Sequence, residues 1–164
     1  MRRRRRLRDA ARPVPDTEMV QLDAAHGRIL ARTLNSPRDV PPADNSAMDG
    51  YAVRAADCSP AETRLSISQR IPAGSTGEAL KPGTAARILT GAPLPPGADA
   101  VVMQEVCRRD GDDVIITVPV TSGSNVRPRG EDVAYDSELL LQGTRLLPQH
   151  IGLAASVGIS QLPV

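Results

Sequence analysis

The sequence predicts an α+β fold that is mostly β. The chain has 13 glycines and 15 prolines among 164 residues, which favours short strands joined by turns over long helices. Between about residues 51 and 143, short apolar runs alternate with turn residues, a pattern typical of a small antiparallel sandwich or barrel. After that region the apolar spacing becomes helical. The length is enough for one domain or two small ones.

The elements before the β-rich part are expected to be short. Residues 7–12 are a candidate helix end, because prolines follow directly. Asp23 is a plausible N-cap and Gly27 a plausible stop for one helical turn. The run 28–34 then reads as a strand.

Four short apolar or alternating runs are the expected strands of the β-rich part, and they are residues 64–68, 85–89, 100–103 and 114–118. Turn residues such as Arg109-Asp110-Gly111-Asp112 bound them. After this part, Pro148 suits the first turn of a helix and Gly158 its C-terminal stop. Residues 159–164 then begin a strand.

Charge is uneven along the chain. The net charge is +1, yet the first twelve residues contain seven arginines and one aspartate, so the remainder is net negative. The run Arg2–Arg6 is able to bind nucleic acid or an anionic membrane by charge alone, but a solvated terminus is the favoured interpretation. We therefore expect no specific nucleic-acid partner.

Membrane and secretion signals are missing from the sequence. No apolar run approaches the roughly 18 residues of a spanning helix, so no membrane partner is expected. The arginines are not followed by an apolar segment, which excludes a secretory or twin-arginine signal. Cys58 and Cys107 lack CxxC spacing, so a disulfide framework is not expected and a cytoplasmic location fits. His26 and His150 have no partner at metal-ligand spacing.

Three polar loops carry the residues suited to chemistry. They span residues 44–51 (DNSAMDGY), 90–99 and 123–132. Each has a purely structural alternative. Met48-Asp49-Gly50 reads as a hairpin turn with positive φ, Thr90-Gly91 as a tight strand end, and Gly130-Glu131-Asp132 as a solvated turn.

Taken together, the three loops hold the parts for metal-assisted phosphoryl or nucleotidyl chemistry. Asp49 and Asp132 are suited to share Mg²⁺, which prefers one or two carboxylates plus waters and substrate phosphate. Thr90 offers a hydroxyl beside a glycine whose backbone can approach an anion closely. Arg127 and Arg129 offer forked donors to a phosphate. Spacing alone does not show that these groups meet.

Four motifs resemble the molybdopterin molybdenumtransferases, the MoeA and gephyrin E-domain family. They read DNSAMDGYAVR, RILTGAPLPPGADAVVMQE, GSNVRPRGEDV and GTRLLPQHIGLAASVGI. The first three are long and follow one another in the family's order, and the resemblance covers about residues 17–164. In that family DNSAMDGY is a site loop, which accounts for its mixed chemistry.

The resemblance implies that adenylylated molybdopterin and molybdate are converted to molybdenum cofactor and AMP with a divalent cation, Mg²⁺. It implies Asp49, Thr90 and Asp132 as catalytic residues. Asp49 and Asp132 would be metal-binding or water-orienting carboxylates, and Thr90 an anion-contacting hydroxyl. The substrate-binding residues it implies are Asn45, Ser46, Met48, Gly50, Tyr51, Gly91, Arg127 and Arg129.

The resemblance also implies a domain organisation. Residues 1–16 would be a basic tail with a remnant helix. Residues 17–45 and 144–164 would form an elongated mixed α/β first domain of the dimerisation type. Residues 46–143 would be a β-rich domain inserted into it. In the family, the cleft pairs this inserted domain with the pterin-binding domain of the partner subunit.

The pterin-binding and C-terminal domains of the family are absent from these residues. The expectation is therefore an N-terminal portion that is inactive alone and works as a homodimer or with a partner chain supplying the pterin-binding domain. The alternative is a non-catalytic dimerisation or interaction module, or a truncated relic of the enzyme. Asp136 also departs from the family, since it stands where glycine is usual; aspartate tolerates left-handed geometry at some cost.

Overall fold

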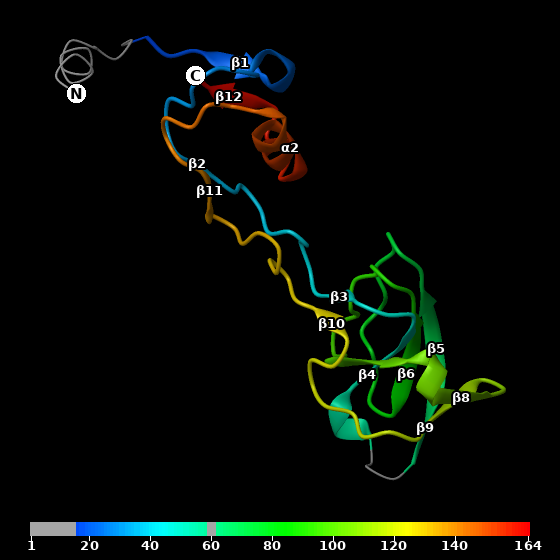
Figure 1. Ribbon diagram of the computed structural model, residues 1–164. Coiled ribbons are helices and arrows are strands. Elements are labelled where there is room, and N and C mark those ends of the chain that lie inside the picture. The colour runs from blue at the N-terminus through cyan, green and yellow to red at the C-terminus, as the bar shows by residue number, and fades with distance from the viewer. Residues whose placement is uncertain (1–15, 59–61) are drawn as a thin grey trace. The chain divides into compact units, whose positions relative to one another are not determined.

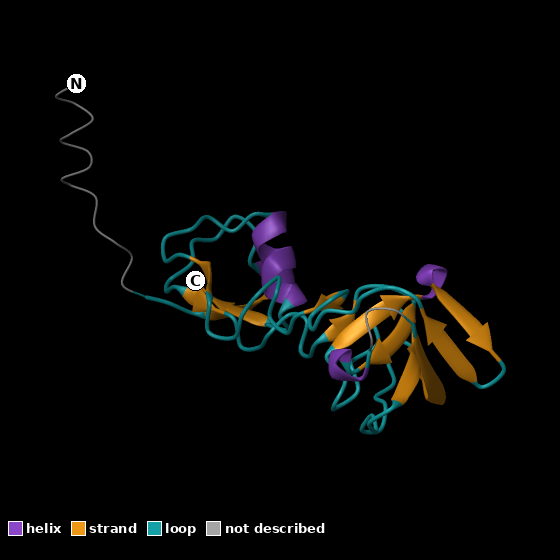
Figure 2. Ribbon diagram, turned by 90° about the horizontal axis from the view of Figure 1, so that it is seen from below, coloured by secondary structure: helices purple, strands orange, loops and turns teal. Residues whose placement is uncertain are grey.

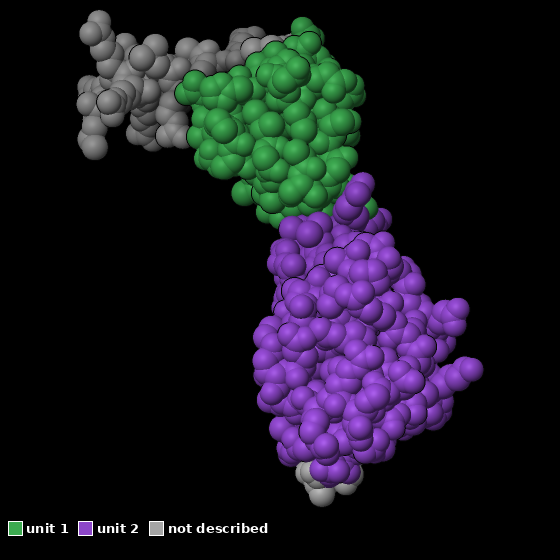
Figure 3. All heavy atoms as spheres, turned by 90° about the vertical axis from the view of Figure 1, so that its right-hand side faces the viewer, with its two compact units in different colours: residues 1–37, 136–164 green, residues 38–135 purple. Residues whose placement is uncertain are grey.

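The computed structural model describes residues 16–58 and 62–164 (Figure 1). The run Arg2–Arg6 and the expected helix end at 7–12 lie outside the described residues. The chain divides into two compact units (Figure 3). Unit 1 comprises residues up to 37 together with 136–164, and unit 2 comprises residues 38–135.

Unit 2 is built on one six-stranded sheet, which is twisted and curled (Figure 2). In sheet order its strands are β7 (Ala100–Met103), β4 (Gly50–Val53), β6 (Thr84–Ile88), β5 (Thr63–Ile71), β9 (Asp113–Ile116) and β8 (Cys107–Asp110). The mostly β prediction is confirmed, and four of these strands match the predicted apolar runs. The sheet is not purely antiparallel, because β5 and β6 run parallel. The connection over residues 72–83 is long enough for that crossover.

The sheet of unit 2 buries an aliphatic core on both faces. Tyr51, Val53 and Leu65 belong to one buried cluster. Ala52 and Ile88 belong to another. Because successive strand residues point to opposite faces, β4 contributes alternately to the two clusters. All four of its residues are buried, which fixes this strand at the centre of the unit.

Smaller elements of unit 2 hold the polar loops. The two-residue strands β3 (Asn45–Ser46) and β10 (Val126–Arg127) pair antiparallel. Short 3-10 helices follow β4 as η2 (Ala55–Asp57) and β7 as η3 (Gln104–Val106). The pairing of β3 with β10 places the first polar loop beside the third.

Unit 1 is a second, smaller core. Its elements are β1 (Met19–Gln21), η1 (Leu22–Ala24), β2 (Leu34–Asn35), β11 (Glu138–Leu140), α2 (Pro148–Ser156) and β12 (Gln161–Pro163). β1 pairs with β12 and β2 with β11, both antiparallel. Leu30, Leu146 and Leu162 are fully buried between these pairs and α2.

The predicted C-terminal helix and strand are confirmed. Pro148 is the first residue of α2, where its missing N–H has no helical partner to lose. Gly158 follows the C-cap Val157 at φ +81°, a left-handed conformation that favours glycine. β12 then begins at Gln161.

Two predictions for the N-terminal part were wrong. Gln21, not Asp23, is the N-cap residue of η1, and Asp23 lies inside that helix. Residues 28–34 do not form one strand. Leu30 N–H donates to Thr144 O, whereas Ala31 N–H donates to Pro163 O, so neighbouring residues pair with different segments. Local apolar character predicted the burial here but not the pairing.

The units differ in their bounds from the predicted domains. Residues 40 and 133 are linked by backbone hydrogen bonds, which ties 38–45 to unit 2. β11 pairs with β2, which ties 138–140 to unit 1. An insertion of 46–143 into a first domain stays a prediction. In the described part of the chain, no helix is both long and apolar enough to cross a membrane.

Candidate functional site

Asp49, in the segment before β4, contacts Thr90, in the turn after β6. Asp49 directly precedes β4, and Thr90 lies two residues after β6 ends. These two strands are antiparallel neighbours in which Gly50 pairs with Ile88. The register therefore brings the start of one strand against the end of the other, and with them the aspartate and the threonine.

Asp49 is held by two hydrogen bonds to a single oxygen. Its Oδ1 accepts from the backbone N–H and from the hydroxyl of Thr90, each at 2.7 Å. The backbone hydrogen bond lowers the pKa of Asp49 most, followed by the hydroxyl, and the charge of Arg87 lowers it further. Among the described residues, nothing hydrogen-bonds to Oδ2, so this oxygen of an ionised carboxylate remains open to a ligand.

Gly50 is required by the close approach of β7. A Cβ at this position would collide with the backbone carbonyl of Val102. Neither Asp49 nor Gly50 has a positive φ, and Gly50 is the first residue of a central strand. The hairpin-turn alternative for Met48-Asp49-Gly50 is therefore wrong.

The rest of the first loop is tied to the turn at Gly91. Ser46 is buried; its hydroxyl donates to Met48 O at 2.6 Å, and its carbonyl accepts from Gly91 N–H at 2.8 Å. Gly91 adopts φ +80°, so Thr90-Gly91 is the tight turn at the strand end that the structural alternative expects. Met48, next to Asp49 in the chain, is 39% exposed. Asn45 lies opposite Arg127 in the β3–β10 pair.

Tyr51 packs into the core of unit 2, with little of its surface exposed. It is 6% exposed, and the Arg87 guanidinium lies 5.4 Å from the centre of its ring, which is a cation–π contact. Arg87 also donates to Gly50 O at 2.8 Å and to Gln104 Oε1. Arg87 was not predicted as a site residue, because its contacts with Tyr51, Gly50 and Gln104 depend on how the strands pair.

The third loop carries a charge cluster around Arg127. Its Nη2 pairs with Asp132 Oδ2, and its Nε donates to Glu131 Oε2 at 2.9 Å. These carboxylates raise the pKa of Arg127, Asp132 foremost. Gly130 adopts φ +72°, so this segment is also a turn. The Asp132 carboxylate is therefore already paired with the Arg127 side chain.

Arg129 belongs to a second cluster in the same loop. Its Nε donates to Asp39 Oδ2 at 2.5 Å, and its backbone N–H donates to Asp44 Oδ1 at 2.7 Å. The backbone N–H of Tyr135, and then Arg129, lower the pKa of Asp39. Asp39 was not predicted as a site residue because it lies outside the family motifs, and Asp44, the first residue of DNSAMDGY, was not predicted either.

The structure joins the predicted site residues only in part. Asp49 contacts Thr90, and Asn45 pairs with Arg127, so the first loop is linked to both of the others. No hydrogen bond or ion pair joins Asp49 to Asp132 in the part of the chain that the structure describes. Within residues 16–58 and 62–164, no group of three or more histidine, cysteine, aspartate or glutamate residues is placed to hold a metal ion.

Comparison with known proteins places these loops in a family. A family model described as the MoeA N-terminal region (domain I and II) matches residues 2–158. The chain belongs to this MoeA N-terminal family. The match includes all three polar loops and the Asp49–Thr90 pair.

Relatives and solved structures agree with the family. A molybdopterin molybdenumtransferase 2 of Mycobacterium tuberculosis is 42% identical over 160 residues, which cover 94% of this chain and 38% of the relative. A molybdopterin molybdenumtransferase of Synechococcus elongatus is 39% identical over 153 residues, covering 90% of this chain and 38% of the relative. A crystal structure of a molybdopterin biosynthesis MoeA protein from Pyrococcus horikoshii OT3 superposes with a TM-score of 0.87 at 39% identity, covering 95% of this chain and 42% of that chain.

The match is confined to the N-terminal part of these longer proteins. This chain spans about two fifths of their length. The relatives are named for molybdenum transfer to molybdopterin, so the MoeA family links this fold to molybdenum cofactor biosynthesis.

Proposed function

We propose that this chain is the N-terminal portion of a molybdopterin molybdenumtransferase. The reaction would insert molybdate into adenylylated molybdopterin and release AMP. The observation that carries the proposal is the Asp49–Thr90 pair, which holds an ionised carboxylate with one open oxygen inside a motif of the family. The names of the relatives support the same chemistry.

Asp49 would orient water or a cation at the reacting phosphate through Oδ2. Thr90 would act chiefly by positioning that carboxylate. A hydroxyl has one proton to donate, and the proton of Thr90 is directed at Asp49 Oδ1. Direct donation from Thr90 to a substrate anion would therefore require this hydrogen bond to break.

The residues fit Mg²⁺ unequally. Asp49 fits, because its carboxylate is ionised and one oxygen is open, and Mg²⁺ accepts one or two carboxylates with water and phosphate as its other ligands. Asp132 would bind the cation only after Arg127 releases it. A bound Mg²⁺ would neutralise charge that develops on the substrate phosphates.

Arg127 and Arg129 would contact the phosphate of the adenylylated substrate. Both side chains are partly exposed, with carboxylates as their partners. If a phosphate replaces Asp132 as the partner of Arg127, the same exchange frees Asp132 for a cation. Asn45, Ser46, Gly50, Tyr51 and Gly91 would then shape the loop, and Met48 would border it.

A partner would supply the pterin-binding part of the cleft. We propose a homodimer or a partner chain for this role; the relatives, of which these residues match 38%, are longer proteins. The apolar side chains of Met19, Ile29 and Leu141 in unit 1 are each more than half exposed, which suits a protein contact. A non-catalytic interaction module remains the alternative.

The test is AMP release from adenylylated molybdopterin by this chain mixed with the pterin-binding part of a relative, and by a full-length protein carrying these motifs. Asp49→Asn should lower turnover about 100-fold or more while leaving the folded fraction unchanged. Asp23→Asn, an exposed aspartate in unit 1, is the matched control and should retain full turnover.

Turnover by Asp49→Asn at the wild-type rate would show that the assigned role is wrong. If the mixture binds tightly but no combination of chains releases AMP, the interaction-module alternative replaces the enzyme proposal.

A further inference from the structure

Unit 2 contains an open groove of about 550 Å³ that the proposed function does not use. Its lining includes three arginines, Arg70, Arg87 and Arg109, against one carboxylate, Asp112. Tyr51 is the one predicted site residue that lines it. The volume lies within the usual range for small-molecule sites, roughly 300–1,000 Å³.

Strand register brings two of the arginines together. Arg70 of β5 lies directly opposite Arg87 of β6 in the parallel ladder. Arg87 in turn lies opposite Tyr51 of β4. Residues opposite one another share a face of the sheet, and like charges in that position destabilise it. The register therefore places two like charges opposite one another on this face of the sheet.

These arginines lack the carboxylate partners that other arginines of unit 2 have. Arg87 donates to Gly50 O and Gln104 Oε1, and Arg109 Nε donates to Gly111 O at 3.0 Å. None of the three forms an ion pair within the described residues. By contrast, Arg54, Arg64, Arg127 and Arg129 of unit 2 each form at least one ion pair with a carboxylate.

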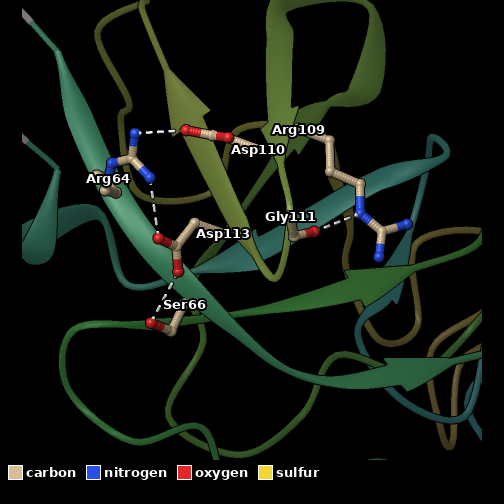
Figure 4. A network of polar contacts seen from close by, with 6 residues as sticks. All are labelled: Arg64, Ser66, Arg109, Asp110, Gly111 and Asp113. Carbon is tan, nitrogen blue, oxygen red and sulfur yellow. Dashed lines mark hydrogen bonds and ion pairs between the residues drawn. The ribbon is translucent and has the colours of Figure 1, made fainter.

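Two carboxylates near the groove, Asp110 and Asp113, form ion pairs with Arg64. Its guanidinium pairs with Asp110 at 2.6 Å and Asp113 at 3.0 Å, and Ser66 also donates to Asp113 (Figure 4). Figure 4 shows Arg109 directed away from this cluster, with its guanidinium beside Gly111. Asp110 and Asp113 are therefore paired with Arg64 and do not neutralise the arginines of the groove.

We propose that this groove binds a phosphate group of a small-molecule anion. Guanidinium forks match phosphate oxygens bidentately and are weakly hydrated, so they suit partly desolvated oxyanions. An anion in the groove would also offset the like charges that Arg70 and Arg87 bring to it. Asp112 borders the site and disfavours a ligand with bulky negative charge on its side of the groove.

The experiment is a titration of the 164-residue chain with inorganic pyrophosphate, followed by amide shifts in ¹⁵N–¹H spectra. We expect saturation with shifts at residues 67–70, 87 and 109–112. Arg70→Gln and Arg109→Gln should each weaken binding about tenfold. Sodium chloride at matched ionic strength should not reproduce the shifts.

Arg108→Gln is the matched control. Arg108 is the exposed neighbour of Arg109 in β8, so it points to the other side of that strand and does not line the groove. It removes the same charge and should leave affinity unchanged. Spectra of each variant without ligand establish that it is folded.

Three results would overturn the proposal. They are shifts confined to the N-terminal arginine run, equal weakening by Arg108→Gln, and identical shifts with chloride. Each would mean that pyrophosphate binds through the net positive charge of the chain and not in this groove. None depends on AMP release, so the groove and the proposed function fail separately.

Discussion

Thr90 donates two hydrogen bonds to one oxygen of Asp49, and both are 2.7 Å long. The donors are the backbone N–H and the hydroxyl of one residue in the turn after β6. This pairing joins two residues of different motifs that are 41 positions apart in the chain. It fixes the carboxylate, favours its ionised form, and leaves its second oxygen open.

The pKa of Asp49 should respond to the Thr90 hydroxyl. Thr90→Ala removes the hydroxyl but keeps the backbone donor, so the pKa should rise part of the way toward its ordinary value of 3.8. Thr90→Ser keeps both donors and is the control. A ¹³C-detected titration of the Asp49 carboxyl measures all three proteins.

The sign of the linked stability follows from the direction of this shift. Because the folded pKa is lowered, the contribution is present above pH 3.8 and is lost as pH falls through the lower folded value. An Asp49 midpoint at 3.8 in the unmodified chain, or no change in Thr90→Ala, would contradict the pairing.

Gly50→Ala should destabilise unit 2, since the new methyl group would meet the carbonyl of Val102 across the sheet. Central strands cannot separate cheaply, and we expect a loss of about 1–3 kcal/mol in the free energy of unfolding. Urea unfolding measures it. Gly152→Ala in α2 is the contrasting variant, with no neighbouring atom within 4 Å, and should gain about 0.5–1 kcal/mol. If Gly50→Ala is as stable as the unmodified chain, β7 moves away to accommodate the methyl group and the close approach does not require glycine.

Asp136 adopts φ +61°, a left-handed backbone conformation that favours glycine. Its carboxylate accepts from Asn35 Nδ2 at 3.1 Å, a contact that both Asp136→Gly and Asp136→Ala remove. The two variants therefore differ mainly in the cost of a left-handed backbone. Asp136→Ala should be less stable than Asp136→Gly by about 1 kcal/mol in urea unfolding. The reverse order would mean that the backbone changes conformation on substitution.

The sequence predicts those strands whose residues carry a local pattern. β5 alternates, β6, β7 and β9 are apolar runs between turns, and α2 is framed by proline and glycine. β4 was missed because it begins on glycine inside a polar motif. β8 was missed because its residues are mostly charged and exposed and carry no apolar pattern. Its strand conformation is stabilised by pairing with β9.

The candidate site was predictable as a set of residues but not as a geometry. Motif residues such as Asp49 and Thr90 are visible in the sequence, yet their contact depends on the register of β4 with β6. Arg87 is an unremarkable charge between two apolar residues until that register places it over Tyr51. Pairing between distant strands is the part that no local pattern contains.

Cys107 should react slowly with alkylating reagents in the folded protein. Burial raises the pKa of its thiol to about 11, and the nearby Cys58 adds to this, while Arg87 acts in the opposite direction. The thiolate is the nucleophile, so raising the pKa from 9.0 to about 11 lowers the reactive fraction at pH 8 roughly 100-fold. Iodoacetamide labelling of Cys58→Ser isolates Cys107, and the same variant unfolded in urea supplies the reference rate.

The same shift predicts how stability changes in alkali. The folded state holds the thiol proton more tightly, so this contribution is complete below pH 9.0 and is lost as pH rises through about 11. Cys107→Ala should therefore show a shallower loss of urea stability between pH 9 and 11 than the unmodified chain. If Cys107 is alkylated as fast in the folded protein as in the unfolded protein, its thiol is exposed. Cys107, the first residue of β8, would then not pack against the core of unit 2.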